Sequence, residues 1–343
     1  MKKIFLFLTL FIMFFSIPLF SGDAKGPLWG KNYYVLFLPY YSFPGMEAAP
    51  GRKSDLSFNL SQYLVQDIVT EFHQYGDTLI KERYIDYEGY IFEPTVSFNP
   101  LDTLEIGLTT RFHVYYGGFL DPVFEAFHSL FSFPNGGRES YGQNEVFINL
   151  HTTSGMDFSL GEPTAAFGDT DLFVKWSFLH LKFMDLALFS AIKLPTGSIE
   201  SVTGSGYGDV ALSLLADFYI TKWLAVYVQN GFTVPGQMLL KNTLSPEPIY
   251  SLLTSVEFIL SRKISLIAQF RLCTSPIKEG VTVPENITHS VKLHKPMTDI
   301  QAGVVMDLSG YRLQMGFEED AFTNNGADLI VNISLSKSFN LHR

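Results

Sequence analysis

Two consecutive runs of alternating residues, 209–220 and 222–234, constrain this chain more than any other feature. In the first run, apolar side chains take every second position: Val210, Leu212, Leu214, Ala216, Phe218 and Ile220. The second run repeats the alternation, and little more than Thr221 separates the two. Period-two alternation predicts β-strands, and so short a connection predicts a tight antiparallel hairpin. Each run is about as long as a tilted strand needs to cross a bilayer, roughly 9–11 residues.

The composition narrows the class of protein further. Charged residues make up only 17% of the chain, whereas aromatic residues reach 15%. The formal net charge of -10 argues against sequence-independent binding of nucleic acid, which needs a basic surface. The one cysteine, Cys273, permits neither an internal disulfide nor a cysteine-based metal cluster.

The first 24 residues have the pattern of an export signal. Lys2 and Lys3 precede an apolar run from Ile4 to Ile17, and Gly22-Asp23-Ala24 places small residues where a signal peptidase reads them. We therefore expect residues 1–24 to be a signal peptide cleaved after Ala24, the alternative being a membrane anchor of marginal length. Because no later window approaches 18 consecutive apolar residues, an exported chain of this kind is either a secreted β-protein or an outer-membrane barrel.

The alternation recurs in twelve predicted strands between residues 56–66 and 327–337. Two classes of connection separate them. Tight turns are predicted at 99–102, 183–185, 221, 261–262 and 309–310, and long loops at 117–167, 195–207, 235–247, 275–296 and 319–326. Tight turns on one rim and long loops on the other are the layout of outer-membrane barrels, and an even strand number returns both ends to the periplasm.

We therefore predict an all-β fold, an antiparallel transmembrane β-barrel of about twelve strands over residues 54–343. Residues 25–53 then form a pre-barrel segment, either periplasmic or inside the lumen. A competing count of fourteen strands pairs residues 32–41 with a short run at 145–150. Within the long loop 117–167, apolar residues from Phe119 to Phe131 have helical spacing and predict one short helix.

If the purely apolar faces contact lipid, the alternate faces line the barrel interior. The ionisable candidates for this lining are Glu93, Glu105, Arg111, His113, Asp217, Glu257, Arg271, Arg312 and Glu318. Both signs of charge are present and neither dominates. Such a mixture suits a weakly selective water-filled pore, and it equally suits a plugged lumen joined by salt bridges.

The loop helix carries Asp121, Glu125 and His128 near one face, and Arg138 follows it. A carboxylate and a histidine at this spacing can bind metal or transfer protons. However, Asp121 is already explained as an N-cap before Pro122. We expect these four residues to constrict the barrel mouth sterically. The sequence contains no phosphate-binding loop, no Gly-x-Ser-x-Gly and no His-Glu-x-x-His, so we predict no cofactor and no metal.

Two segments resemble a bacterial family of uncharacterised, predicted outer-membrane proteins. The first runs from Gly117-Gly118-Phe119-Leu120-Asp121 through Phe127-His128 to Pro134-Asn135-Gly136-Gly137-Arg138. The second is Lys193-Leu194-Pro195-Thr196-Gly197 followed by Gly208-Asp209. The resemblance implies a barrel in the outer membrane. It assigns no activity, so no functional residue is carried over from it.

The functional expectation is a channel or transporter that passes small solutes or apolar molecules, with outer-membrane lipid and a lumen ligand as partners. Two alternatives from other classes stay open. One is a membrane-embedded enzyme acting on lipids through Asp121, His128 and His113. The other is a surface or scaffold barrel that transports nothing and meets partners through its long loops.

Overall fold

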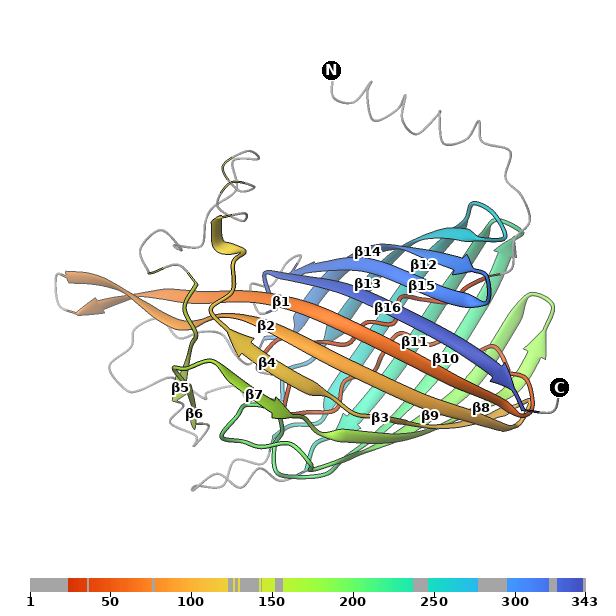
Figure 1. Cartoon of the computed structure of the whole chain (residues 1–343), viewed down its shortest axis with the longest axis horizontal. Coiled ribbons are helices and arrows are strands. Elements are labelled where there is room, and N and C mark those ends of the chain that lie inside the picture. The colour runs from red at the N-terminus through yellow and green to blue at the C-terminus, as the bar shows by residue number, and fades with distance from the viewer. Residues whose placement is uncertain are drawn as a thin grey trace, which may run out of the picture.

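A barrel surrounds a stretch of chain from near the N-terminus in the computed structural model (Figure 1). The structure describes residues 24–35, 37–75, 78–122, 126, 129, 142, 144–151, 157–236, 246–276, 295–320 and 326–341. Residues 1–23 of the expected signal peptide lie outside this set.

The described part of the chain contains 16 strand segments. They are β1 (Asp55–Tyr75), β2 (Thr78–Leu101), β3 (Leu104–Thr109), β4 (Phe112–Tyr116), β5 (Phe147–His151), β6 (Asp157–Leu160), β7 (Thr164–Phe167), β8 (Thr170–Leu181), β9 (Met184–Leu194), β10 (Asp209–Thr221), β11 (Leu224–Val234), β12 (Ile249–Ile259), β13 (Ile264–Cys273), β14 (Met297–Leu308), β15 (Tyr311–Asp320) and β16 (Leu329–Asn340).

Pairing reduces these segments to twelve barrel strands. β3 and β4 both pair with β2 and form one interrupted strand. β8 pairs with β3, and β7 with β4, so they form the next strand. β5 and β6 form a hairpin off the main path, and β1 closes the barrel by pairing with both β2 and β16. The predicted count of twelve is therefore confirmed, and the count of fourteen is wrong.

The short connections lie on one rim. Only residues 102–103, 182–183, 222–223, 260–263 and 309–310 separate the paired strands there. The barrel also begins and ends at this rim, since the backbone N–H of Leu341 donates to the carbonyl of Ser54 at 3.0 Å. Figure 1 shows the C-terminal end beside these turns. The predicted tight turns are thus confirmed to within a residue or two, and we call this the short-turn rim.

The two faces of each strand differ in the way that the alternation predicts. On β10, Val210, Leu212 and Leu214 are 59%, 56% and 45% exposed, whereas Ala211 and Leu215 are buried. Large exposed apolar side chains recur on strands all round the barrel. A belt of this extent would be unfavourable in water, and it suits contact with lipid hydrocarbon.

The first hairpin is longer than the sequence pattern suggests. β1 has 21 residues and β2 has 24, and both project beyond the other strands (Figure 1). At about 3.3 Å per residue, β1 alone rises roughly 70 Å. Strand structure continues to Tyr75 and resumes at Thr78, well beyond the strand predicted at 56–66. Backbone hydrogen bonds between β1 and β2 hold this hairpin together. The part that projects beyond the lipid has no apolar face to bury, so its sequence does not need to alternate.

The long loop 117–167 contributes a second, smaller hairpin. β5 pairs with β2 through Ile85↔Ile148 and with β6. The extra strand expected at 145–150 therefore exists, but it does not pair with 32–41. The helix expected over 119–131 lies largely outside the described residues. Among those residues, no helix is long and apolar enough to cross a membrane.

The apolar belt generates a first prediction. Leu214 lies near the middle of β10 with its side chain outward. Leu214→Arg should destabilise the protein by about 2–4 kcal/mol, because a cation at the bilayer midplane loses its hydration. Ile220→Arg, on the same face near the short-turn rim, should cost only about 0–1 kcal/mol. Urea unfolding in lipid vesicles measures both, and equal effects would contradict a lipid-facing β10.

Candidate functional site

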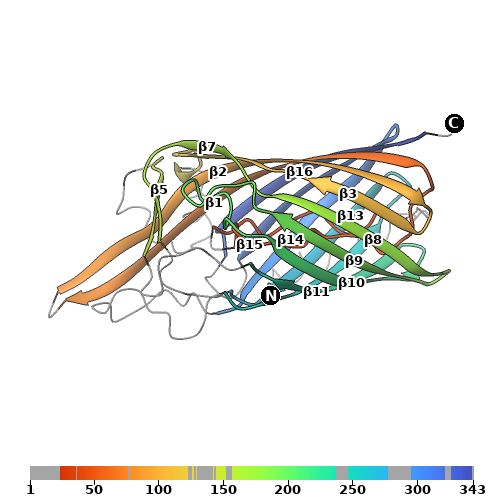
Figure 2. The same ribbon diagram turned by 90° about the horizontal axis from the view of Figure 1, so that it is seen from below.

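Residues 25–53 are called the plug here, and most of their described part, up to residue 50, lies inside the barrel (Figure 2). The plug starts at the short-turn rim, where Lys25 Nζ lies 3.4 Å from the carbonyl oxygen of Ser261. It ends at the same rim, where Lys53 N donates to Asp102 Oδ1 at 2.6 Å. Between these points it reaches the far end of the lumen, where the Pro39 carbonyl accepts from Lys193 Nζ at 2.7 Å. The segment therefore runs up the lumen and returns.

The two limbs of the plug contact each other. Asn32 N donates to Ser42 Oγ at 3.1 Å. At Gly45 the limbs are so close that a Cβ atom would lie 2.2 Å from the carbonyl oxygen of Leu28, so only glycine fits there. A short turn reverses the chain at the tip, where Phe37 N donates to the Tyr34 carbonyl at 2.9 Å.

Side chains of the barrel wall bind the backbone of the plug. A chain without regular structure carries unpaired N–H and C=O groups, and these need partners in a lumen as much as in a protein core. The wall supplies them at Leu28 N to Gln269 (3.2 Å), Tyr41 N to Asp209 (2.7 Å), Met46 N to Gln229 (3.3 Å), Ala48 N to Asp217 (2.7 Å) and Arg271 to Gly30 O (2.7 Å). The inward polar face of the strands is therefore the binding surface for the plug.

A buried ion cluster joins plug and wall at mid-lumen. Lys31 Nζ lies 3.2 Å from Glu93 and 3.0 Å from Asp171. Arg111 lies 2.9 Å from the same Glu93 and also pairs with Asp171. Tyr33 adds a 2.6 Å hydrogen bond to Glu93. Two cations thus neutralise two carboxylates, and this pairing is what allows the four charged groups to be buried.

A second cluster holds the tip of the plug. Lys193 is fully buried and pairs with Asp169, with Asp209 at 3.5 Å from its ammonium group. The same ammonium donates to the Pro39 carbonyl, and Asp209 accepts from Tyr41 N. Lys193 and Asp209 belong to the strand-end motif noted in the sequence, so this motif supports the plug.

A third cluster lies on the opposite wall. Arg271 donates to the Gly30 carbonyl and lies 3.4 Å from Glu318 and 3.6 Å from Asp299. Gln301 bridges the two acids, donating to Glu318 at 2.6 Å and to Asp299 at 3.0 Å. Cations in all three clusters therefore bind carbonyl groups or acids inside the lumen.

The structure places all nine predicted lining residues on the inward face. Seven of them are buried: Glu93, Arg111, His113, Asp217, Glu257, Arg271 and Glu318. Glu105 and Arg312 keep side-chain exposures of 17% and 32%. Most of them contact the plug or each other, so the lumen is of the plugged kind that the sequence left as one of two alternatives.

The family-like segment at Gly117 wraps around one buried carboxylate. Phe119 N donates to Glu88 Oε1 at 2.8 Å, and Leu120 N donates to the same oxygen. Gly118 has φ +78° and lies against Glu88, so its place needs glycine. Asp121 accepts from Asn144 N at 2.9 Å.

The other candidates of this loop, Glu125, His128 and Arg138, lie outside the described residues. Their constricting role therefore stays a prediction. No group of three metal-binding side chains occurs within the part that the structure describes.

Sequence reasoning missed the plug side of the clusters. The sequence pattern assigned no role to Lys31 or Tyr33. A usable signal was present, because Lys31 is the one charged residue between Gly26 and Pro44. A lone charge inside an apolar run indicates a buried partner.

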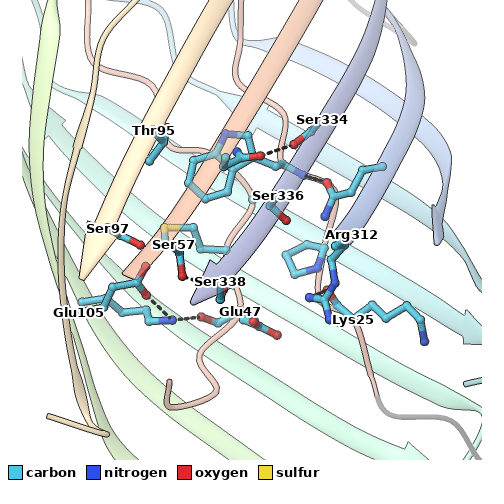
Figure 3. Close-up of a pocket in the computed structure, with 18 of the residues that line it drawn as sticks. Lys25, Glu47, Ser57, Thr95, Ser97, Glu105, Arg312, Ser334, Ser336 and Ser338 are labelled. Atoms are coloured by element: carbon cyan, nitrogen blue, oxygen red, sulfur yellow. Dashed lines mark hydrogen bonds and ion pairs between the residues drawn. The ribbon is translucent and has the colours of Figure 1, made fainter. Parts of the chain in front are cut away.

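A cavity of about 200 Å³ lies beside the plug, toward the short-turn rim (Figure 3). Its wall on β1, β2 and β16 carries small polar side chains: Ser57, Asn59, Thr95, Ser97, Ser334, Ser336 and Ser338. Charged side chains of both signs surround it, and Lys175 Nζ lies 3.1 Å from Glu105. Glu47 of the plug also lines it, and burial raises the pKa of that carboxyl above its usual value.

The opposite wall is packed. The ring of Phe43 lies against Gly231, where a Cβ atom would meet it at 2.5 Å, and it contacts Phe189 edge-on at 6.2 Å between centroids. Tyr41 and Met46 belong to the same apolar cluster, with alanines of β9 and β10. Aromatic rings thus fill this side near the plug, whereas the small serine side chains opposite border the cavity.

The tip cluster generates a second prediction. Lys193→Met keeps the side-chain length but leaves two acids and the Pro39 carbonyl without their cation. Breaking a buried pair in this way should cost about 3–5 kcal/mol. We expect faster hydrogen exchange in residues 34–44, measured by mass spectrometry. Lys182→Met, on an exposed turn, is the control, and equal exchange in both variants would contradict the role of Lys193.

Comparison with solved structures finds outer-membrane proteins, and one of them superposes well enough to share this fold. The COG4313 outer membrane channel from Pseudomonas putida F1 superposes with a TM-score of 0.54 at 12% identity, over 87% of this chain and 99% of that one. A Pseudomonas aeruginosa FadL homologue gives a TM-score of 0.43 at 8% identity, over 93% and 100% of the two chains. At such identities the similarity is one of fold alone.

Sequence comparison places the chain in a family. No curated protein matches it. The family model described as "Protein of unknown function (DUF3187)" matches residues 54–339. That range starts just before β1 and ends within β16, so it covers the whole barrel and leaves the plug outside. The chain therefore belongs to the DUF3187 family of proteins of unknown function, and the matched residues form its β-barrel.

Proposed function

We propose that this protein is exported by its signal peptide to the outer membrane and there conducts small polar solutes. In this proposal the solutes pass along the serine-lined side of the lumen when the plug shifts. The observation that carries it is the cavity between the plug and β1, β2 and β16, which opens toward the short-turn rim.

The lining of the cavity favours polar solutes. Serine side chains are small, so they leave space, and each hydroxyl can donate and accept a hydrogen bond. The surrounding charges are mixed, with Lys175 and Arg312 facing Glu47 and Glu105. A pore mouth with both signs of charge selects weakly between ions, and it suits neutral or zwitterionic solutes.

The plug has the properties of a movable closure. Its backbone is held mainly by side chains of the wall, and such contacts can exchange one at a time, unlike a strand ladder. The similarity to a solved outer membrane channel gives independent support for conduction by this fold.

A matched pair of substitutions on β16 tests the path. Ser336 lines the cavity, whereas the neighbouring Leu335 is 43% exposed on the outer face. Ser336→Trp should lower single-channel conductance severalfold, because the indole fills the free space. Leu335→Trp adds the same ring to the lipid side and should leave conductance unchanged. Planar-bilayer recording measures both.

The channel would be refuted by the absence of stepwise conductance in the wild type and also in Lys193→Met, whose plug should be loosened. An equal effect of the two tryptophans would refute the serine-lined path.

A further inference from the structure

One buried carboxylate of the lumen binds the beginning of the plug. Glu257, on β12, is fully buried. Both of its carboxylate oxygens lie 3.0 Å from the backbone nitrogen of Lys25. Tyr227 donates its hydroxyl to the same carboxylate and accepts from Gly26 N at 3.3 Å. The site is thus built around a single backbone nitrogen.

Glu257 differs from most of the acids described above in its counter-charge. Glu93, Asp171, Asp169, Asp299 and Glu318 each pair with a lysine or arginine. Among the described residues, no side-chain cation lies within ion-pair distance of Glu257. The nearby Arg312 donates instead to the Lys25 carbonyl and to Asp307, each at 3.0 Å. A buried carboxylate bound only by neutral donors is an unfavourable arrangement.

The sequence predicts how a positive charge comes to lie beside Glu257. The small-residue pattern Gly22-Asp23-Ala24 predicts that a signal peptidase cleaves directly before Lys25. Water then hydrolyses the Ala24–Lys25 peptide bond, which leaves a carboxylate on Ala24 and an amine on Lys25 that takes up a proton. The nitrogen that faces Glu257 is the one that becomes an ammonium group.

We propose that Glu257 and Tyr227 form the binding site for the α-ammonium group of the mature N-terminus, Lys25. Cleavage converts a neutral amide contact into a charge-assisted hydrogen bond, which is shorter and roughly twice as strong. The start of the plug is therefore anchored more strongly once the signal peptide is removed. The proposal does not depend on conduction by the barrel.

Two measurements on the purified mature protein test it. Mass spectrometry should give Lys25 as the first residue. The α-amine should then resist an amine-acylating reagent near pH 7, where an α-amine with a pKa of about 7.7–8.0 reacts before lysines at about 10.4. Tandem mass spectrometry separates Nα from Nζ on Lys25.

Glu257→Gln keeps the shape and an acceptor but removes the charge. We expect the α-amine of this variant to be acylated at least about tenfold faster, since breaking a buried charge pair shifts such equilibria by that much or more. Glu105→Gln is the matched control, because Glu105 lines the same cavity and pairs with Lys175. It should keep the wild-type protection.

A second variant tests the same contact without changing Glu257, so the test does not depend on the folding of Glu257→Gln. One glycine inserted between Ala24 and Lys25 moves the ammonium group away from Glu257 while every barrel residue is retained. Its α-amine should react as fast as that of Glu257→Gln. A mature chain that begins elsewhere, or equal protection in all variants, would overturn the proposal. Neither result would bear on conductance, so the two proposals fail separately.

Discussion

The ion cluster at mid-lumen is the interaction on which the interior of this protein depends. Glu93 and Asp171 come from the wall, and they are neutralised jointly by Arg111 of the wall and Lys31 of the plug. Without the plug, one cation would face two buried acids; without the wall, Lys31 would have no counter-ion there. The plug and the wall therefore neutralise each other's buried charges, because an unpaired charge is costly away from water.

Side-chain volume decides where the lumen is closed and where it is open. The wall from β8 to β11 combines alanines with Phe173 and Phe189, and the rings of Tyr41 and Phe43 pack onto it. The wall of β1, β2 and β16 carries serines where it borders the cavity, whereas farther along the lumen Tyr63 of β1 packs against Tyr33 of the plug. The open space beside the plug therefore lies where the side chains of the wall are small.

Three of the attachments that hold the plug lie far apart along its length. Glu257 binds its first residue, the central cluster binds Lys31, and the tip cluster binds the carbonyl of Pro39. The tip and the start lie at opposite ends of the lumen. Release at one point would leave the others in place, so a partial shift of the plug costs less than its removal. This arrangement agrees with a closure that opens along one side.

The sequence by itself determined the barrel. Alternation in runs such as 209–220, together with tight turns such as 309–310, gave the twelve strands, the rim that carries the turns and the face of each lining residue. These features are local, since period-two patterning and turn chemistry act over a few residues. Only the tertiary structure decided what fills the lumen. The plug has no periodicity, and its partners lie far away in the chain, as Lys31 and Asp171 do, 140 residues apart. Contacts between a backbone atom and a distant side chain leave no repeating pattern, so they exist only once the barrel has closed around them.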